Sequence, residues 1–404
     1  MADSEGPRAP SQRPWVQVIV SFLLWFNGWG IVNSFGAWQT YYEENLLSKE
    51  SSSNISWIGS IQAFLLLVIG CVAGRLFDLG YARSLTAVGS LLIVFGIMMT
   101  SISSTYWQVL LAQGLCQGLG AGLIYIPSVA VLPQFYTKRR AFAQGIAASG
   151  SSLGGIVYTL SFAELEHRVG FPWATRIIGF IAFITLLVAS LLIRQINPPR
   201  STAPLFDTGA FRDVSFLCFT VAATAAFIGL YVPIFYIKSY ILHEQLADPS
   251  IMTYILPVLN AANGVGRVIP NFFADSTGPL NMLIPCSLAT SVIAYSWIAS
   301  STTPSITAFA VLYGFFSGTF VSLSPTSLTS LSPSLSVVGQ RIGTCFTIAS
   351  FGLLLGSPLS GLMIRELDSY IGPQILSGST LFIATCSLVV GRYAKAGARL
   401  SEIV

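Results

Sequence analysis

The chain has 404 residues, of which 53% are hydrophobic and only 9% are charged, whereas soluble domains carry roughly 25% charged residues. This composition excludes a soluble globule and predicts an all-α integral membrane protein with several membrane-spanning helices. Twenty basic and sixteen acidic residues give a formal net charge of +4.

The chain begins with a polar, proline-rich segment, 1–14, that lacks the small-residue cleavage site of a signal peptide, and we expect a disordered cytoplasmic tail there. Six apolar segments follow in 15–194 and six more in 214–393, each long enough to cross a bilayer core of about 30 Å. A polar stretch at 195–213 is the predicted linker between these halves, and 394–404 is a second cytoplasmic tail. The twelve spans are predicted at 15–40, 56–77, 84–103, 107–132, 140–163, 174–194, 214–237, 251–273, 280–300, 304–325, 338–363 and 373–393.

Most lysines and arginines lie in the termini and in the even-numbered connections, which predicts that the termini and the linker are cytoplasmic. The two histidines lie in expected loops, and the cysteines lie in apolar stretches without CxxC spacing, so we expect no catalytic site, metal or cofactor. The cysteines are Cys71, Cys116, Cys218, Cys286, Cys345 and Cys386.

The first predicted span carries Asn33 within N-S-F-G-A-W-Q-T-Y-Y. Such a small and polar face either lines a pathway or packs against neighbouring helices. Tyr125, Tyr231 and Tyr313 in later spans could add aromatic contacts to a ligand or serve as ordinary packing.

Two connections are expected to form a cytoplasmic gate. The one between spans two and three reads G-R-L-F-D-L-G-Y-A-R and contains Gly74, Asp78 and Arg83. The matching connection of the second half reads N-F-F-A-D-S-T-G and contains Asp275. This correspondence is a weak internal repeat, of the kind found in transporters built from two related halves.

The eighth span contains the one basic residue that the sequence places well inside a span. Arg267 follows Asn260 and Asn263 at offsets of 0, 3 and 7, so the three side chains share one helical face. A guanidinium at membrane depth costs roughly 3 kcal/mol on insertion scales and is expected to face an interior or a cavity. We expect these residues and Asn33 to bind a substrate; the alternative is that Arg267 only pairs with a neighbouring helix.

These motifs resemble the major facilitator superfamily over essentially the whole chain. The segment 74–83 looks like its loop signature between spans two and three. The segment 135–155, F-Y-T-K-R-R-A-F-A-Q-G-I-A-A-S-G-S-S-L-G-G, is similar to the entry into span five of the monocarboxylate transporter family. The first span and S-W-I-G-S-I-Q in the second are most similar to its fungal monocarboxylate-permease-like branch. The resemblance implies twelve helices in two six-helix halves, with Arg267 matching a substrate-binding arginine.

The departures from that family concern proton coupling. Asn263 replaces an acidic residue, and Asn33 aligns with a lysine that proton-coupled members carry. Gly114 and Ser151 replace the arginine and the proline of two signature motifs. Proton-coupled transport of a lactate-type substrate therefore does not follow from the resemblance.

The resemblance implies a secondary transporter, not an enzyme, that moves a small organic, monocarboxylate-like and anionic metabolite by alternating access. The alternatives are an exporter of a secondary metabolite and a non-transporting, substrate-sensing receptor of the same fold. We expect a monomer in the lipid bilayer with a small-molecule substrate and no nucleic-acid partner. The membrane is expected to be the plasma membrane, with the vacuolar membrane as the alternative.

Overall fold

The computed structural model describes residues 14–136, 139–196, 208–246, 249–333 and 338–397. Every regular element within these residues is a helix, so the all-α prediction is confirmed for them. The predicted tails lie largely outside the described residues, and so does most of the predicted linker.

The N-terminal half runs from α1 to α8. Its elements are α1 (Pro14–Tyr41), η1 (Tyr42–Leu46), α2 (Ser52–Val68), α3 (Gly70–Asp78), α4 (Ala82–Thr100), α5 (Tyr106–Val109), η2 (Leu110–Gln117), α6 (Gly118–Ala130), α7 (Leu132–Phe135) and α8 (Arg140–Leu192). The short elements η1 and η2 are π-helical. They continue α1 and join α5 to α6, so neither interrupts a membrane crossing.

The C-terminal half runs from the short helix η3 to α15. Its elements are η3 (Thr208–Arg212), α9 (Val214–Leu230), α10 (Val232–His243), α11 (Pro249–Thr277), α12 (Pro279–Ser296), η4 (Trp297–Ala299), α13 (Thr303–Leu331), α14 (Val338–Leu367) and α15 (Ile371–Ala396). Tyr231 separates α9 from α10, which together make one crossing.

Ten helical segments within the described residues are long and apolar enough to cross a membrane. One of them is α8, with 53 residues, whose backbone breaks at Gly170 (φ 75°) and which covers both spans predicted in 140–194. The polar stripe of α11 lowers its mean hydropathy, and α11 is not among the ten. Counting the two arms of α8 separately and adding α11 gives the twelve crossings expected from the sequence.

The connection within α8 differs from the predicted loop after residue 163. The backbone stays helical through 164–169, where Glu164 and Arg168 form an ion pair one turn apart. Such pairs stabilise an exposed helix. Gly170 then adopts a positive φ, which a residue with a Cβ rarely tolerates, and the chain reverses.

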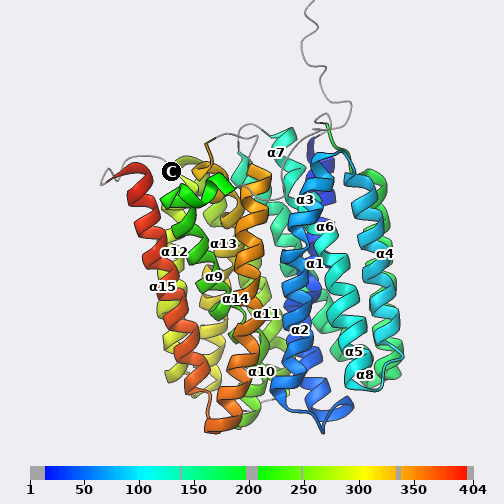
Figure 1. The fold of residues 1–404 in the computed structure, drawn as a ribbon. Helices are drawn as coiled ribbons and strands as arrows, with labels where there is room; N and C mark the ends of the chain where they lie inside the picture. Colours follow the sequence, from blue (N-terminus) through cyan, green and yellow to red (C-terminus); the bar gives the residue numbers. More distant parts are fainter. Residues whose placement is uncertain (1–13, 137–138, 197–207, 247–248, 334–337, 398–404) are drawn as a thin grey trace, which may run out of the picture.

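The two halves lie side by side, with α1–α8 on the right and α9–α15 on the left of Figure 1. The start of α1 and the end of α15 lie at the same end of the bundle, as an even number of crossings requires. Several helix pairs join the halves, among them α2 with α14, α8 with α11, α3 with α14 and α1 with α10. The candidate site lies at the second of these contacts.

Candidate ligand-binding site between the two halves

Arg267 lies inside α11 and is only 1% exposed. Its position is ten residues before the helix end at Thr277, or about 15 Å at 1.5 Å per residue. Its Nε donates to Asn263 Oδ1 at 2.7 Å, and its Nη1 donates to the carbonyl of Ala148 on α8 at 3.2 Å. The guanidinium carbon lies 5.5 Å from the ring centre of Trp25 on α1. Arg267 therefore bridges the two halves at mid-depth.

No carboxylate among the described residues forms an ion pair with Arg267. Its charge is balanced by the Asn263 and Ala148 oxygens and by the face of the Trp25 ring, a stabilising arrangement that is strongest where water is excluded. The two oxygens belong to dipolar groups and the aromatic ring carries a quadrupole, so none of these partners supplies a full negative charge. The site therefore keeps a net positive charge, which favours an anion over a neutral or cationic molecule.

Asn263 holds the Arg267 side chain in place. Its Oδ1 also accepts from the Ser152 hydroxyl of α8 at 2.9 Å, and its Nδ2 donates to Ser317 Oγ of α13 at 3.3 Å. One amide thus ties three helices together and orients the guanidinium. The predicted pair of Asn263 and Arg267 is in direct contact in the structure, with Asn263 as the positioning member.

The other two predicted binding residues are less directly connected to Arg267. Asn260 is 1% exposed, donates to the Leu256 carbonyl of its own helix at 3.0 Å, and lies against Gly155 of α8, where a Cβ would come 2.7 Å from its Oδ1. Asn33 is 2% exposed on α1, and its Oδ1 has no hydrogen-bond partner among the described residues. No hydrogen bond joins Asn33 to Arg267.

Along the contact between α8 and α11, small residues of α8 face polar residues of α11. Gly145, Ala148, Ser152 and Gly155 of α8 contact, in that order, residues 271, 267, 263 and 260 of α11. The two series run in opposite directions along their helices, so the pair is antiparallel. The small α8 side chains leave room for the amides and the guanidinium between the two backbones.

Asn271 extends the polar stripe by one turn and was not among the predicted site residues. It is fully buried, and its Nδ2 donates to the Arg267 carbonyl at 2.6 Å and to Ser322 Oγ of α13 at 2.7 Å. Its offset of 11 from Asn260 continues the 0, 3, 7 series, so the helical period could have identified it.

The predicted gate residues do not gather in one place. Asp275 reaches from the end of α11 to the start of α8, where Oδ1 accepts from the backbone N–H of Ala141 and Oδ2 from that of Phe142, both at 3.1 Å. It thus caps a helix of the opposite half, whose own N-terminal flanking residue, Arg139, has a left-handed backbone and no capping side chain. The negative carboxylate also favours this helix N-terminus.

The gate residues of the N-terminal half lie on α3 and α4, away from Asp275. Asp78 ends α3, which packs against α14 of the opposite half. Gly74 is one turn earlier, with no neighbour within 4 Å of where its Cβ would be, and Arg83 lies exposed in the first turn of α4. The structure therefore places Asp275 at one half-to-half contact and Asp78 at the end of a helix that takes part in another.

The halves also contact each other at the opposite end of the bundle. Glu43, in η1, accepts a hydrogen bond from Ser239 Oγ of α10 at 3.1 Å, and Ser53 Oγ of α2 donates to the Pro358 carbonyl of α14 at 3.3 Å. The first span was predicted to end at residue 40, but η1 continues the helix to Leu46 and leaves the Glu43 carboxylate partly buried. With contacts at both ends, the conformation is occluded around Arg267.

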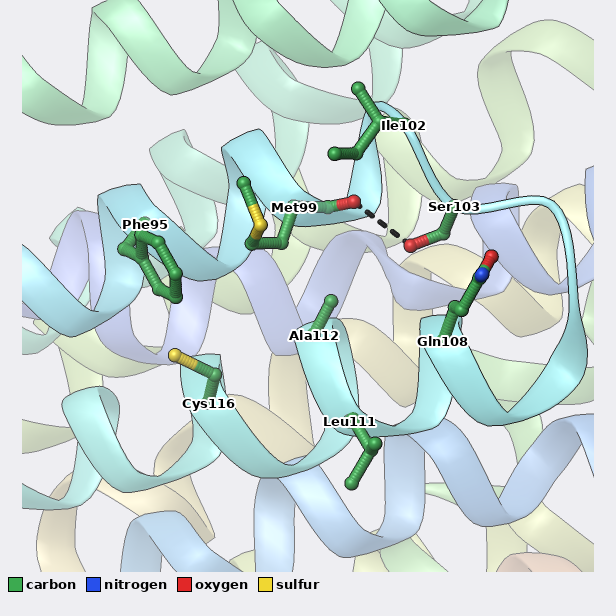
Figure 2. A pocket seen from close by; sticks show the side chains of 8 residues that line it. All are labelled: Phe95, Met99, Ile102, Ser103, Gln108, Leu111, Ala112 and Cys116. Carbon is green, nitrogen blue, oxygen red and sulfur yellow. Dashed lines mark hydrogen bonds between the residues drawn. The ribbon is translucent and has the colours of Figure 1, made fainter.

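A hollow lies away from this interface, between α4 and η2 (Figure 2). It measures about 340 Å³, and both helices that border it belong to the N-terminal half. No charged side chain lines it, and Phe95 and Leu111 at its edge are each 57% exposed, as expected for lipid-facing residues. It offers no charged anchor for an anionic ligand. Its lining residues are Phe95, Met99, Ile102, Ser103, Gln108, Leu111, Ala112 and Cys116.

Comparisons with known proteins agree with this architecture. Residues 18–284 match the family model of the Major Facilitator Superfamily. The chain is 44% identical over 373 residues to the MFS-type transporter dbaD of Emericella nidulans, covering 92% of this chain and 84% of that protein. It is 35% identical over 397 residues to an MFS-type transporter of Gibberella zeae, covering 97% and 89% of the two chains.

A further relative is the aspyridones efflux protein apdF of Emericella nidulans, which is 33% identical over 384 residues, covering 93% of this chain and 78% of that protein. All three relatives are named as transport or efflux proteins and none as an enzyme. The membrane class, the all-α fold and the non-enzymatic role predicted from the sequence are thereby confirmed. The chain belongs to the major facilitator superfamily of membrane transporters.

Proposed function

We propose that this transporter moves a small organic anion across the membrane by alternating access, with Arg267 as the anchor of the anion. The observation that carries the proposal is a fully buried guanidinium, without an ion pair among the described residues, at the contact between the two halves. A buried unpaired charge is costly, and an anionic ligand would remove that cost.

The hydrogen bonds of Arg267 support a link between ligand binding and movement of the halves. The bond to Asn263 lies within α11, whereas the bond to the Ala148 carbonyl crosses to the other half. Separation of α8 from α11 breaks only the second bond and frees Nη1, beside Nη2, for a bidentate contact with a carboxylate or a similar anion. The ligand thus replaces the hydrogen bond that the Ala148 carbonyl accepts from Arg267 in the occluded state.

Export of a secondary metabolite is the direction that the relatives favour. One of them is named as an efflux protein for aspyridones, and we propose the same direction here for a different or related organic acid. Monocarboxylate-like specificity has weaker support, because it depends on the resemblance of residues 135–155 and of the first two spans alone. A receptor role has no specific observation in its favour.

The test is transport in sealed inverted vesicles that contain the full-length protein, supplied with an organic-acid extract and followed by mass spectrometry. Export appears as accumulation inside the vesicles. Arg267→Ala should abolish accumulation, and Arg267→Lys should leave only weak transport because the planar fork is lost. The matched control is Arg341→Lys, since Arg341 is also buried but pairs with Asp213 within one half. Ordinary accumulation with Arg267→Ala would overturn the proposal.

A further inference from the structure

Four aromatic side chains next to Arg267 form a continuous buried cluster. Trp25 and Trp29 of α1 stack with their ring centres 6.3 Å apart, and Trp29 stacks on Tyr231 at 5.6 Å with 22° between the planes. Tyr125 of α6 lies edge-on to Trp25 at 5.7 Å and to Trp29 at 6.2 Å. We call these four residues the central aromatic cluster; none is more than 5% exposed.

The cluster spans the boundary between the halves. Trp25, Trp29 and Tyr125 belong to the N-terminal half, whereas Tyr231 lies between α9 and α10 of the C-terminal half. Movement of the halves apart must therefore separate the stacked pair of Trp29 and Tyr231. Each ring then loses the aromatic face that covers it in the occluded state, unless another flat group takes that place.

Two hydrogen-bond donors in the cluster have no acceptor. The indole Nε1 atoms of Trp25 and Trp29 are buried and have no hydrogen-bond partner among the described residues. Buried indole N–H groups usually have one, because an unsatisfied donor costs free energy. The guanidinium of Arg267 lies over the Trp25 ring. The cluster thus combines flat apolar faces, unused N–H donors and a positive charge.

From this combination we infer that the transported anion is flat and conjugated, with acceptor oxygens, such as an aryl carboxylate, an acidic phenol or an acidic enol. An aliphatic acid of the same charge could satisfy Arg267 but could not replace the stacking between Trp29 and Tyr231. The inference rests on the proposed function, because it requires that the ligand bind at Arg267. It adds that ring stacking, and not charge alone, sets the specificity.

The test compares two carboxylates of equal charge and similar size, 2-naphthoate and its saturated counterpart decahydronaphthalene-2-carboxylate. Binding to the purified full-length protein is measured by isothermal titration calorimetry at neutral pH. We expect 2-naphthoate to bind about two- to twelvefold more tightly, the usual gain from one aromatic pair. Trp29→Leu should weaken binding of 2-naphthoate more strongly than binding of the saturated acid, so that the preference disappears.

Trp297→Leu is the matched control. Trp297 is also buried, stacks on Phe309 and has an Nε1 without a partner among the described residues, but it lies in η4, outside the cluster. This variant should keep the full preference. If Trp29→Leu does not fold, Trp29→Phe, which keeps a flat ring, should retain most of the preference for 2-naphthoate. The comparison of the two acids with the wild-type protein remains decisive in either case.

The outcomes separate this inference from the proposed function. Equal affinities of wild type for the two acids, both lost in Arg267→Ala, would overturn the inference and leave the anion anchor intact. Binding of both acids that persists in Arg267→Ala would overturn the proposed function as well. Absence of 2-naphthoate binding at ~1 mM, the weak end of specific affinities, would also overturn the inference.

Discussion

Removal of the Asp275 carboxylate should open the end of the bundle at which α11 caps α8. Its two oxygens accept from the Ala141 and Phe142 backbone N–H groups, each at 3.1 Å, and these bonds join the two halves. A capping side chain is worth about 1 kcal/mol and a charge at a helix N-terminus about 0.3–1 kcal/mol more. Because Asp275 is exposed, salt screens the second contribution. We therefore expect a loss of about 1 kcal/mol.

A loss of this size should increase the fraction of molecules that are open at this end of the bundle about fivefold. Asp275→Ala should show the full effect, and Asp275→Asn about half of it, because an amide oxygen can still accept one bond. Turnover should slow because the closed state forms less often. Ligand affinity should stay nearly unchanged, because Asp275 lies eight residues from Arg267, about 12 Å along the helix.

The assay is single-molecule Förster resonance energy transfer between one fluorescent label at the start of α4 and one at the start of α12, in a variant without reactive native cysteines. Asp213→Ala is the control, because Asp213 caps α9 of its own half through Ser215 and Phe216. It should lower the thermal midpoint without widening the distance distribution. The reasoning is refuted if Asp275→Ala leaves this distribution unchanged, or if it abolishes ligand affinity while turnover stays normal.

Three further predictions concern other parts of the molecule. Transport should continue without obligatory proton movement. Glu43→Gln, whose amide oxygen can still accept a hydrogen bond from the other half, should therefore transport at a rate that does not depend on pH. A ligand-dependent proton flux that is lost in this variant would contradict the prediction. Gly266→Ala should destabilise the protein by about 1–3 kcal/mol, because the added Cβ would overlap the α13 backbone. Gly74→Ala is the control: open space surrounds the position of its Cβ, so the thermal midpoint should stay unchanged. Burial raises the pKa of Asp213, but hydrogen bonds from Arg341 and two backbone N–H groups outweigh it and hold this pKa below its ordinary value. This stabilisation is present above the unfolded pKa and is lost as the pH falls through the folded pKa. Arg341→Gln should therefore move acid unfolding, followed by tryptophan fluorescence, to higher pH.

The spans and the polar stripe could be predicted because both are local, periodic properties of the sequence. Apolar length identifies a crossing, and offsets of 3 and 4 place Asn263 and Arg267 on one face whatever surrounds them. The contact between these two side chains in the structure follows from that spacing. Their role as ligand anchors stays a prediction.

The remaining parts of the site depend on which helices become neighbours. Nothing local to Asp275 indicates that it caps α8, since its partners lie more than 130 positions earlier in the chain. The stack of Trp29 on Tyr231 likewise joins residues about 200 positions apart. The end of the first helix was predicted too early, at residue 40, for a local reason, because the π-helical turn η1 extends this helix through E-E-N-L, a polar stretch that resembles a loop.

The contacts of α11 with α13 and with α8 bear on how the halves move. Within the C-terminal half, α11 and α13 meet backbone to backbone at Gly266 and Gly318, where any added Cβ would collide with a carbonyl of the other helix. Such contacts cannot slide without repacking. Between the halves, Gly145 of α8 also lies close to the Arg267 carbonyl, but Ala148 and Ser152 contact α11 through hydrogen bonds, which water or a ligand can replace. The bundle should therefore change conformation by movement of two rigid halves, with the Arg267 interface as the part that exchanges its partners.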